Sequence, residues 1–418
     1  MQKKLKKYKI RNYCRLCASK KIKKILSLPK VPPGEQLRKK LEYDFVEVPI
    51  DVYKCQKCHH FQLINIPNDN LMWNDEYTFV PSLNKNINKH FLKTVKYISN
   101  KFKPKITKAF EIGSNDGSFL KLIKKQFDCD VLGIDPSKLP RQIAKKNGIK
   151  TINKFFNYKE SIKIKKRNGK FDLIIANNVF AHTDDLNNML KGIDNLLTKE
   201  GIFTFEISYL LDVLKKRLIG TIIHEHLSIH SIISLKKFFN EFKMELIDIR
   251  HDPNIQGGAL VGFVKRKQIK KNKISIILKK FEKKEIEFDL NNNSIFGWYE
   301  DYFYKKINTF VKKIKMQSKN KKIVCYGASR PLPIILKLLQ IEKKVEFVLD
   351  NNKFKFNKFL PIENIQIVDP NKHIFSKDKI YLISGWVHTN KIIKSIRKFS
   401  KFKNKFITIF PQYKIISK

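Results

Sequence analysis

Four cysteines stand in two pairs with the spacing of metal ligands. Cys14 and Cys17 form the first pair, Cys55 and Cys58 form the second, and each pair encloses two residues. This spacing lets both thiolates of a pair face one ion, and the loop between the pairs supplies the other half of a tetrahedron. Two disulfides are the alternative, but the lysine-rich chain shows no secretory signal. The sequence therefore predicts a structural zinc ion held by these cysteines.

A turn with two glycines, residues 111–117, reads Glu-Ile-Gly-Ser-Asn-Asp-Gly after a short apolar run. Gly113 and Gly117 permit positive φ and close backbone approach. A dinucleotide fingerprint would carry another glycine where Asn115 stands. Glu111 and Asp116 would repel a pyrophosphate but suit a cationic ligand without phosphate. S-adenosylmethionine (SAM), which carries a sulfonium and an ammonium group, meets this requirement, so we predict a SAM site here.

Polar side chains also follow the next two apolar runs. Asp135 ends a predicted strand at 131–135, where a carboxylate can accept bonds from both ribose hydroxyls. Asn177 and Asn178 follow a predicted strand at 171–176 and should lie at the carboxyl edge of the sheet, where ligands bind in open α/β folds. We predict that all three contact the cofactor; the alternative is that they are turn-forming residues.

Histidines and a tyrosine are candidate reactive groups. His224 and His226 are two residues apart, so on a strand they would share one face, and with Glu225 they could ligate a metal. Adjacent ligands alternate faces on a strand, however, and no His-Glu-x-x-His spacing is present. Structural alternatives also stand: His226 could be a core histidine, His182 could cap the helix that follows it, and Tyr77 could serve packing alone.

These motifs together resemble the sugar C-methyltransferases that act on nucleotide-linked 4-keto-deoxysugars. The resemblance extends over nearly the whole chain. The motifs that carry it are the cysteine pairs, the 111–117 turn, the Asn-Asn-Val-Phe-Ala-His segment at 177–182, His-Glu-His-Leu-Ser at 224–228, and Gly257-Gly258. The resemblance implies a zinc domain, a methyltransferase core and a C-terminal Rossmann-like domain that helps to enclose the nucleotide sugar.

The resemblance also implies a mechanism and roles for the candidate residues. In that family a ketone at C4 acidifies the proton on C3, a histidine removes the proton, and the enolate carbon attacks the methyl group of SAM. His226 matches the general base and Glu225 its neighbour in the active site. His182 and Tyr77 match side chains near the enolate.

Two positions depart from the family pattern. Ile223 stands where family members usually carry a tyrosine, so a hydroxyl is lost from the site and the regiochemistry or the substrate can differ. The turn at 327–331, Gly-Ala-Ser-Arg-Pro, replaces a Gly-Ala turn that is followed by Lys-Gly. This second departure leaves the nucleotide contacts open.

The elements that position these residues follow from alternating apolar and amphipathic runs. We expect an α/β protein with an N-terminal zinc-binding domain at 1–72, a Rossmann-like methyltransferase domain at 73–250 and a Rossmann-like substrate-binding domain at 251–418. The apolar runs predict strands at 46–52, 109–112, 131–135, 171–176, 201–207, 322–326, 345–350 and 381–386. The amphipathic runs predict helices at 84–102, 118–127, 138–147, 186–197 and 333–339, and a charged helical stretch at 266–318.

Composition limits the class of protein. The chain has 418 residues and a formal net charge of +48, but its lysines are spread along most of the sequence, and residues 110–120 and 171–190 contain no Lys or Arg. This distribution disfavours nucleic-acid binding and fits solvated faces or the attraction of an anionic nucleotide sugar. No apolar run reaches the length of a membrane helix, which favours a cytoplasmic protein, as a monomer or weak oligomer.

Three functions remain open from sequence. The first is a SAM-dependent C-methyltransferase acting on a nucleotide-linked keto-deoxysugar. The second is an O- or N-methyltransferase of the same fold, which has less need of a carbon base. The third is a non-catalytic zinc-containing nucleic-acid or assembly factor, and the intact acidic set at residues 111, 116 and 135 argues against it.

Overall fold

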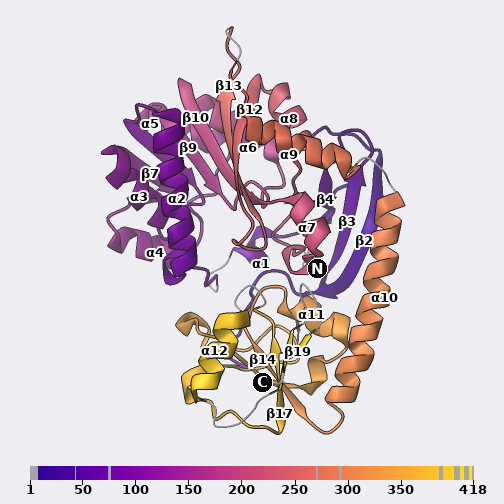
Figure 1. Cartoon of the computed structure of the whole chain (residues 1–418). Helices are drawn as coiled ribbons and strands as arrows, with labels where there is room; N and C mark the ends of the chain where they lie inside the picture. Colours follow the sequence, from indigo (N-terminus) through magenta and orange to yellow (C-terminus); the bar gives the residue numbers. More distant parts are fainter. Residues whose placement is uncertain are drawn as a thin grey trace, which may run out of the picture.

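The computed structural model describes residues 8–42, 44–73, 77–269, 272–290, 294–385, 389–399, 405–408 and 414–416. Three parts surround a common centre (Figure 1). A large α/β part occupies the upper left, the N-terminal strands lie at the right, and a second α/β part lies below. None of the described helices combines the length and hydropathy needed to cross a membrane.

The large α/β part is built on a seven-stranded sheet in the order β12-β13-β10-β9-β6-β7-β8. All neighbouring pairs are parallel except those that β13 makes with β10 and β12. In chain order the strands are β6 (Lys108–Ile112), β7 (Asp130–Ile134), β8 (Thr151–Ile152), β9 (Phe171–Asn177), β10 (Leu197–Ser208), β12 (Met244–Asp252) and β13 (Ala259–Arg266). The sheet thus continues to Arg266, beyond the expected end of the methyltransferase domain at residue 250.

Helices cover both faces of this sheet because its central strands are apolar on both sides, as crossover connections require. One apolar cluster joins Phe110, Phe171 and Ile174 to residues of α6 and α8, and another joins Leu173 and Ile175 to residues of α2 and α3. The helices are α2 (Lys85–Phe102), α3 (Ser118–Phe127), α4 (Lys138–Lys146), α5 (Tyr158–Asn168), α6 (Leu186–Leu196), α7 (Leu210–Lys216), α8 (Ile232–Glu241) and α9 (Ile276–Glu287).

The N-terminal part is a four-stranded antiparallel sheet in the order β11-β4-β3-β2, with a separate β1-β5 ribbon. Its elements are β1 (Tyr8–Ile10), β2 (Ile22–Val31), β3 (Val48–Cys55), β4 (Phe61–Leu63), β5 (Asn65–Pro67), the short helix α1 (Asp69–Met72), the 3-10 helix η1 (Pro81–Leu83) and β11 (Ser228–Ile229). Strand β11 comes from the segment directly after His226 and pairs with β4. The N-terminal sheet therefore holds the histidine segment by backbone hydrogen bonds.

The C-terminal part is a six-stranded sheet in the order β16-β15-β14-β17-β18-β19, parallel except for β19. Its strands are β14 (Lys322–Tyr326), β15 (Val345–Leu349), β16 (Ile367–Val368), β17 (Lys379–Ile383), β18 (Lys405–Thr408) and β19 (Lys414–Ile416). Its helices are α10 (Ser294–Gln317), α11 (Leu332–Leu339), α12 (Thr389–Phe399) and the 3-10 helices η3 (Glu342–Lys344), η4 (Lys353–Lys355) and η5 (Pro370–Lys372).

Helix α10 runs beside β2 from the level of the large sheet down to the C-terminal part (Figure 1). A single apolar cluster contains residues of β2, β3 and β4 together with residues of α10, α11 and the C-terminal sheet. The C-terminal part is therefore packed on the N-terminal strands through a shared core. This core fixes the position of the C-terminal part relative to those strands.

The expected α/β architecture is confirmed, with two Rossmann-like sheets and an N-terminal part that holds the cysteines. The 118–127 helix and the 322–326 strand have the predicted bounds. His224 and His226 do not lie on a strand: both follow the 3-10 helix η2 (Ile219–Thr221), and His224 lies in a turn. Residue 386 of the expected 381–386 strand lies outside the described residues.

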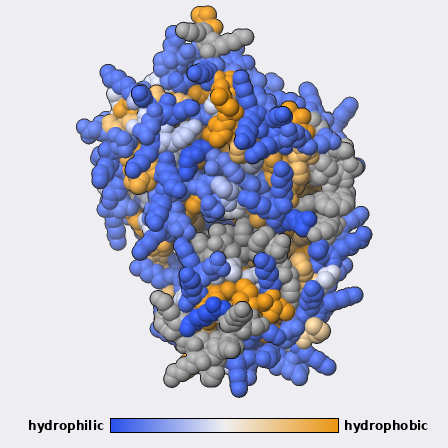
Figure 2. Space-filling view, viewed as in Figure 1, coloured by the Kyte–Doolittle hydropathy of each residue, from blue (hydrophilic) through white to orange (hydrophobic). Residues whose placement is uncertain are grey.

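Figure 2 shows one face of the molecule, on which hydrophilic side chains predominate and hydrophobic patches are small. The hydrophilic surface extends over both α/β parts and is not confined to one patch. This agrees with the interpretation of the lysines as solvated faces.

Candidate active site and zinc centre

A cavity of about 800 Å³ lies at the carboxyl edge of β6, β7, β9 and β10. Its other walls come from the N-terminal part, from the loop before β11 and from the turn after β14. The carboxyl edge of a doubly wound sheet is where ligands bind. Each of the predicted cofactor and catalytic residues except Gly117 and Glu225 lines this cavity.

The predicted cofactor turn has the backbone that its glycines allow. Gly113 has a φ of +67°, and a Cβ atom there would lie 2.3 Å from Cγ2 of Val179. Gly117 has a φ of +73°, and a Cβ atom would lie 2.8 Å from Cγ1 of Ile149. Asn115 is also left-handed, with a φ of +48°. A side chain at either glycine would displace the neighbouring loop, so the close turn depends on both.

Glu111 and Asp135 give the cofactor end of the cavity its acidic character. Oε1 of Glu111 accepts a bond of 3.3 Å from the Asn177 amide, but Oε2 is buried without a hydrogen-bond partner in the described part of the chain. Burial, and then the charge of Asp116, raises the pKa of Glu111 well above its ordinary value. A buried carboxylate oxygen without a donor fits a cationic ligand or a ligand that offers N–H or O–H groups.

Asp135 is oriented by the cofactor turn. Its Oδ2 accepts a bond of 3.0 Å from the backbone N–H of Asn115, and its Oδ1 accepts a bond of 2.8 Å from Ser137 N–H. Burial raises the pKa of Asp135, while the two N–H donors act in the opposite direction. Each carboxylate oxygen can accept a second bond, so the side chain retains the capacity to hold two ribose hydroxyls.

Asp116 and Asn178 are engaged with the protein itself. Oδ1 of Asp116 accepts bonds from the backbone and hydroxyl of Ser118 at 3.1 and 2.6 Å, and Oδ2 accepts from Ser82 N–H at 3.0 Å. Asn178, with a φ of +53°, donates from its amide to Oε1 of Glu206 at 2.9 Å. Both residues therefore shape the loops of the cavity, and their own polar atoms have less capacity left for a ligand.

One ring nitrogen of His226 is hydrogen-bonded to the protein, and the other is available to a ligand. Its Nδ1 lies 2.5 Å from the carbonyl oxygen of Thr221, so Nδ1 carries the proton and donates. Nε2 then keeps its lone pair, which is the state that a general base needs. Burial lowers the pKa of His226 to about 4, against the opposing effect of the Thr221 carbonyl, so the ring is neutral at pH 7.

Aromatic rings form a column beside His226. The His182 ring stacks on His226 with centroids 5.2 Å apart, and the Trp73 ring also stacks on His182 at 5.2 Å. Tyr77 continues the column, with its ring 5.3 Å from that of Trp73. His182 does not cap the following helix, because the side chain of Asp185 accepts the capping bond from Asn188 N–H. The sequence indicated His182 and Tyr77 for this region, but it gave no role to Trp73.

His224 does not join His226 in a metal site. Its Nε2 contacts the carbonyl oxygen of Val48 at 3.0 Å, and the residue is 2% exposed. In the described part of the chain, the cluster that could hold a metal is the four cysteines. The alternative of a histidine metal site at 224–226 is therefore wrong, and His224 anchors the loop to β3.

Arg330 reaches this site from the C-terminal part, and the sequence did not indicate it as a site residue. Its Nε lies 3.2 Å from Oε1 of Glu225, and its guanidinium lies 4.8 Å from the ring centre of Tyr77. Burial alone would lower the pKa of Arg330, but the charges of Tyr77 and Glu225 outweigh it and raise the pKa. Glu225, which the sequence placed beside the base, is therefore the counter-ion of this arginine.

A second histidine cluster lines the cavity near Asn178. Nε2 of His90 lies 2.6 Å from Oε2 of Glu206, and Nδ1 lies 3.3 Å from Oδ2 of Asp252. The bonds to these carboxylates outweigh burial and raise the pKa of His90. The sequence did not indicate this cluster, because its three members come from α2, β10 and β12.

The four predicted zinc ligands converge. Their sulfur atoms all lie within 4.8 Å of one another, with 3.5 Å between those of Cys14 and Cys58 and 3.6 Å between those of Cys17 and Cys55. Three of the four are buried. Four converging thiols fit a tetrahedral structural zinc ion, which would hold the two turns together.

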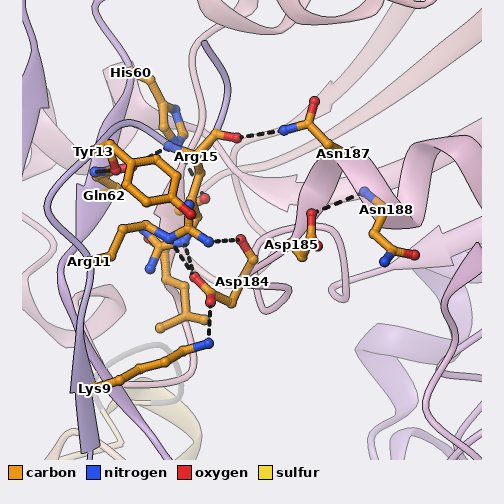
Figure 3. A network of polar contacts seen from close by, with 12 residues as sticks. Lys9, Arg11, Tyr13, Arg15, His60, Gln62, Asp184, Asp185, Asn187 and Asn188 are labelled. Atoms are coloured by element: carbon orange, nitrogen blue, oxygen red, sulfur yellow. Dashed lines mark hydrogen bonds and ion pairs between the residues drawn. The ribbon is translucent and has the colours of Figure 1, made fainter. Parts of the chain in front are cut away.

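An arginine inside the first cysteine pair, Arg15, belongs to a network of polar contacts around Asp184 (Figure 3), and Asp184 lines the cavity. The Arg15 side chain is fully buried, and its Nε lies 3.2 Å from Oδ1 of Asp184. Its Nη1 donates to the carbonyl oxygen of Leu227 at 2.9 Å. Asp184 also accepts from Arg11 and pairs with Lys9, at 2.8 and 2.7 Å. Arg15 thus contacts the segments that follow His182 and His226.

Comparisons with known proteins agree with this arrangement. Three family models match successive parts of the chain: a zinc binding domain at 14–73, a methyltransferase domain at 110–203 and a C-methyltransferase C-terminal domain at 254–411. The C-methyltransferase NovU of Streptomyces niveus is 25% identical over 382 residues, which cover 88% of each chain.

Two solved methyltransferase structures match part of this chain. The plantazolicin methyltransferase BpumL in complex with SAH is 15% identical, with 42% of this chain and 82% of that chain covered and a TM-score of 0.34. The magnesium protoporphyrin IX methyltransferase ChlM of Synechocystis PCC 6803 is 12% identical, with 43% and 83% covered and a TM-score of 0.34. Because both TM-scores lie below 0.5, these likenesses carry no conclusion about this chain.

Proposed function

Since this chain is a SAM-dependent methyltransferase with the domains of the C-methyltransferases, we propose that it methylates an enolisable carbon of a nucleotide-linked keto-deoxysugar, with His226 as the general base. Carbon becomes nucleophilic only after it loses a proton, so the reaction needs a positioned base. The observation that carries the proposal is the 2.5 Å contact of His226 Nδ1 with Thr221, which leaves Nε2 free to accept that proton.

The cofactor end of the cavity fits SAM. Glu111 offers a buried carboxylate oxygen without a donor, and Asp135 offers two oxygens that the cofactor turn orients. We propose that Asp135 holds the ribose and that Glu111, with Asn177 as its partner, faces the amino-acid part of the cofactor. When bound, SAM supplies an electrophilic methyl group. The residues of the turn hold the cofactor at the sheet edge and take no part in proton transfer.

The substrate end of the cavity lies against the C-terminal part. His226, His182 and Tyr77 line it with Ile223, whose apolar side chain stands beside the base. The choice of a nucleotide-linked keto-deoxysugar rests on the resemblance of the motifs and on the enclosure of the cavity by the C-terminal domain. His226 takes the proton from the carbon next to the carbonyl group, and the stacked His182 ring limits the rotation of the imidazole.

The proposal is tested by proton exchange without a methyl donor. The protein is incubated in D₂O with a panel of nucleotide-linked 4-keto-sugars, and deuterium incorporation is followed by NMR; labelled SAM then reports methylation. We expect exchange at the methylated carbon, and we expect His226→Asn to lower both rates by ~10²–10⁴-fold, the usual contribution of a general base.

The matched control is His373→Asn, because His373 lies in the C-terminal part and does not line the cavity. This variant should keep both rates. Methylation of oxygen or nitrogen without carbon exchange would contradict the proposal and would favour the O- or N-methyltransferase alternative.

A further inference from the structure

We propose that Arg330 is a catalytic residue that donates an N–H bond to the carbonyl oxygen of the substrate while that oxygen carries the enolate charge. The proposal rests on the proposed function, because it concerns the same proton abstraction. It assigns to the C-terminal part a direct role in the chemistry in addition to enclosure of the substrate.

The turn that carries Arg330 is rigidly placed. The backbone N–H of Ala328 donates to Oδ2 of Asp350 at 2.7 Å, and the Ala328 carbonyl accepts from Lys355 Nζ at 2.8 Å. Lys355 in turn pairs with Glu35 of the N-terminal part at 2.8 Å. Pro331 directly follows the arginine and caps α11. The backbone that carries the Arg330 side chain is therefore held in place.

The guanidinium itself is held on two sides. Glu225 lies 3.2 Å from Nε, and the rings of Tyr77 and Phe79 lie 4.8 and 5.8 Å from the guanidinium carbon. The side chain is 17% exposed. A cation over an aromatic face is attracted to the electron-rich face of the ring. These contacts restrain the planar group in the wall of the cavity.

One donor group of this arginine is unused. Nη2 is buried and has no hydrogen-bond partner among the described residues, although Arg330 lines the cavity. Buried donors of folded proteins are almost always paired, so an unpaired one in a cavity points to a bond that a ligand completes. A guanidinium offers only donors, so the missing partner is an oxygen with lone pairs.

Arg330 lines the same cavity as His226 and His182, and it pairs at 3.2 Å with Glu225, the residue directly before His226. The positive charge of Arg330 adds to burial in lowering the pKa of both His226 and His182. The same charge would stabilise a negative oxygen at that place. Three lysines also line the cavity: Lys9 pairs with Asp184 at 2.7 Å, Lys355 pairs with Glu35 at 2.8 Å, and Lys154 is exposed. Arg330 combines an ion pair next to the base with a buried donor that the described residues leave unused, so it is suited to meet a charge that develops next to His226.

An enolate oxygen fits this donor better than a phosphate group does. The buried Nη2 group, with its two N–H donors, matches a single oxygen whose charge grows during the reaction. In the proposed step the C–H bond breaks, the proton passes to Nε2 of His226, a C=C bond forms, and the carbonyl oxygen takes the charge beside Nη2.

The test separates kcat from KM. We expect Arg330→Gln to lower kcat for methylation and the rate of deuterium exchange by ~10²–10³-fold, as the loss of an oxyanion donor does, with little change in KM or in the Kd for SAM. Arg330→Lys should recover only part of the loss, because a single ammonium cannot hold Glu225 and reach the oxygen in the same way. Arg38→Lys, at a partly exposed ion pair with Glu42 outside the cavity lining, is the matched control and should keep both rates.

A second measurement guards against misfolding. Arg330→Ala opens a cavity beside Glu225, and millimolar methylguanidinium should restore part of kcat if the variant is folded and the cation acts on the oxygen. In Arg330→Gln the acid limb of the pH profile should also move to higher pH, because one of the groups that lower the pKa of His226 is gone.

Different results would overturn the role of Arg330 and the proposed function. A rise in KM with kcat unchanged would show that Arg330 binds a ground-state anion such as the phosphates, and it would overturn this proposal. Unchanged exchange in folded Arg330→Gln would overturn it as well, while leaving the proposed function intact. A wild-type protein without exchange or methylation on the sugar panel would instead overturn the proposed function, and with it the role of Arg330.

Discussion

The protonation state of His226 decides how activity depends on pH. Burial lowers its pKa from 6.5 to about 4, so the ring stays neutral, and able to accept a proton, well below pH 6.5. Protonation removes the lone pair as pH falls through about 4. We therefore expect kcat/KM to stay level from pH 8 to about pH 5.5 and to approach a tenfold loss per pH unit below about pH 4. Initial rates in short pH-jump assays measure this profile.

The stability of the fold also changes within part of this pH range, so the activity profile needs a control for unfolding. The unfolded chain binds a proton at His226 below pH 6.5, whereas the folded chain does so only near pH 4, so stability is lost as pH falls between these values. Near-UV circular dichroism at each pH shows whether the assayed protein is still folded. An acid limb centred at 6.5 in folded protein would contradict the assignment of the buried ring as the base.

The elements that carry the two histidines are held together by the first zinc turn. Arg15, between Cys14 and Cys17, binds Asp184 after β9 and the Leu227 carbonyl before β11 (Figure 3). The loop positions of His182 and His226 thus depend on a residue whose own backbone is fixed by the metal ligands. This gives the zinc centre a role in the placement of the base without any part in the chemistry.

We expect Arg15→Met to lower kcat by ~10–100-fold while zinc content and SAM affinity are kept, because about 1.5–3 kcal/mol of charge-assisted hydrogen bonding is lost from the loops. Arg15→Lys should recover part of the rate, since an ammonium can still reach one of the two acceptors. Zinc stoichiometry, SAM titration and kcat are measured on the same samples.

The matched control is Lys57→Gln, an exposed position inside the second cysteine pair. It should leave kcat and zinc content unchanged. If Arg15→Met lost zinc and its fold together, or kept its full rate, the positioning role would be wrong.

Local patterns predicted the elements well, and long-range pairs were not predictable. The 118–127 helix follows from its apolar periodicity and the glycine before it, and the cysteine spacing predicted the zinc cluster. Arg330 and Glu225, in contrast, are separated by more than a hundred residues and meet only because the C-terminal part packs on the N-terminal strands. No periodicity encodes such a contact. Asp116 illustrates the converse, because a residue type suited to a cationic ligand is used to bind Ser82 and Ser118.

At the scale of the whole molecule, one buried ion pair joins the N-terminal and C-terminal parts over the cavity. Oε1 of Glu35 lies 2.8 Å from Lys355 Nζ, and Oε2 accepts from the backbone and hydroxyl of Thr78 at 2.8 and 2.7 Å. Burial would raise the pKa of Glu35, but the charges of Lys355 and Arg330 outweigh it and lower the pKa to about 2. The carboxylate is therefore charged at every pH at which the enzyme would be used.

Removing one partner of this buried ion pair should destabilise the fold more than replacing both partners. Glu35→Gln leaves the Lys355 ammonium buried without a counter-ion, and we expect a loss of about 3–5 kcal/mol in the free energy of unfolding, whereas Glu35→Gln combined with Lys355→Met should recover much of it. The free energy of unfolding of the wild type, the two single variants and the double variant is measured by urea titration, followed by two probes. Glu346→Gln, at the partly exposed Lys379 pair within the C-terminal sheet, should cost no more than about 1 kcal/mol. Additive losses in the cycle would mean that the two side chains act independently.

The same pair should affect activity, because Lys355 also holds the Ala328 carbonyl. The single variants should lower kcat as the Arg330 turn shifts. A Glu35→Gln protein with full activity would show that the turn keeps its place without the pair.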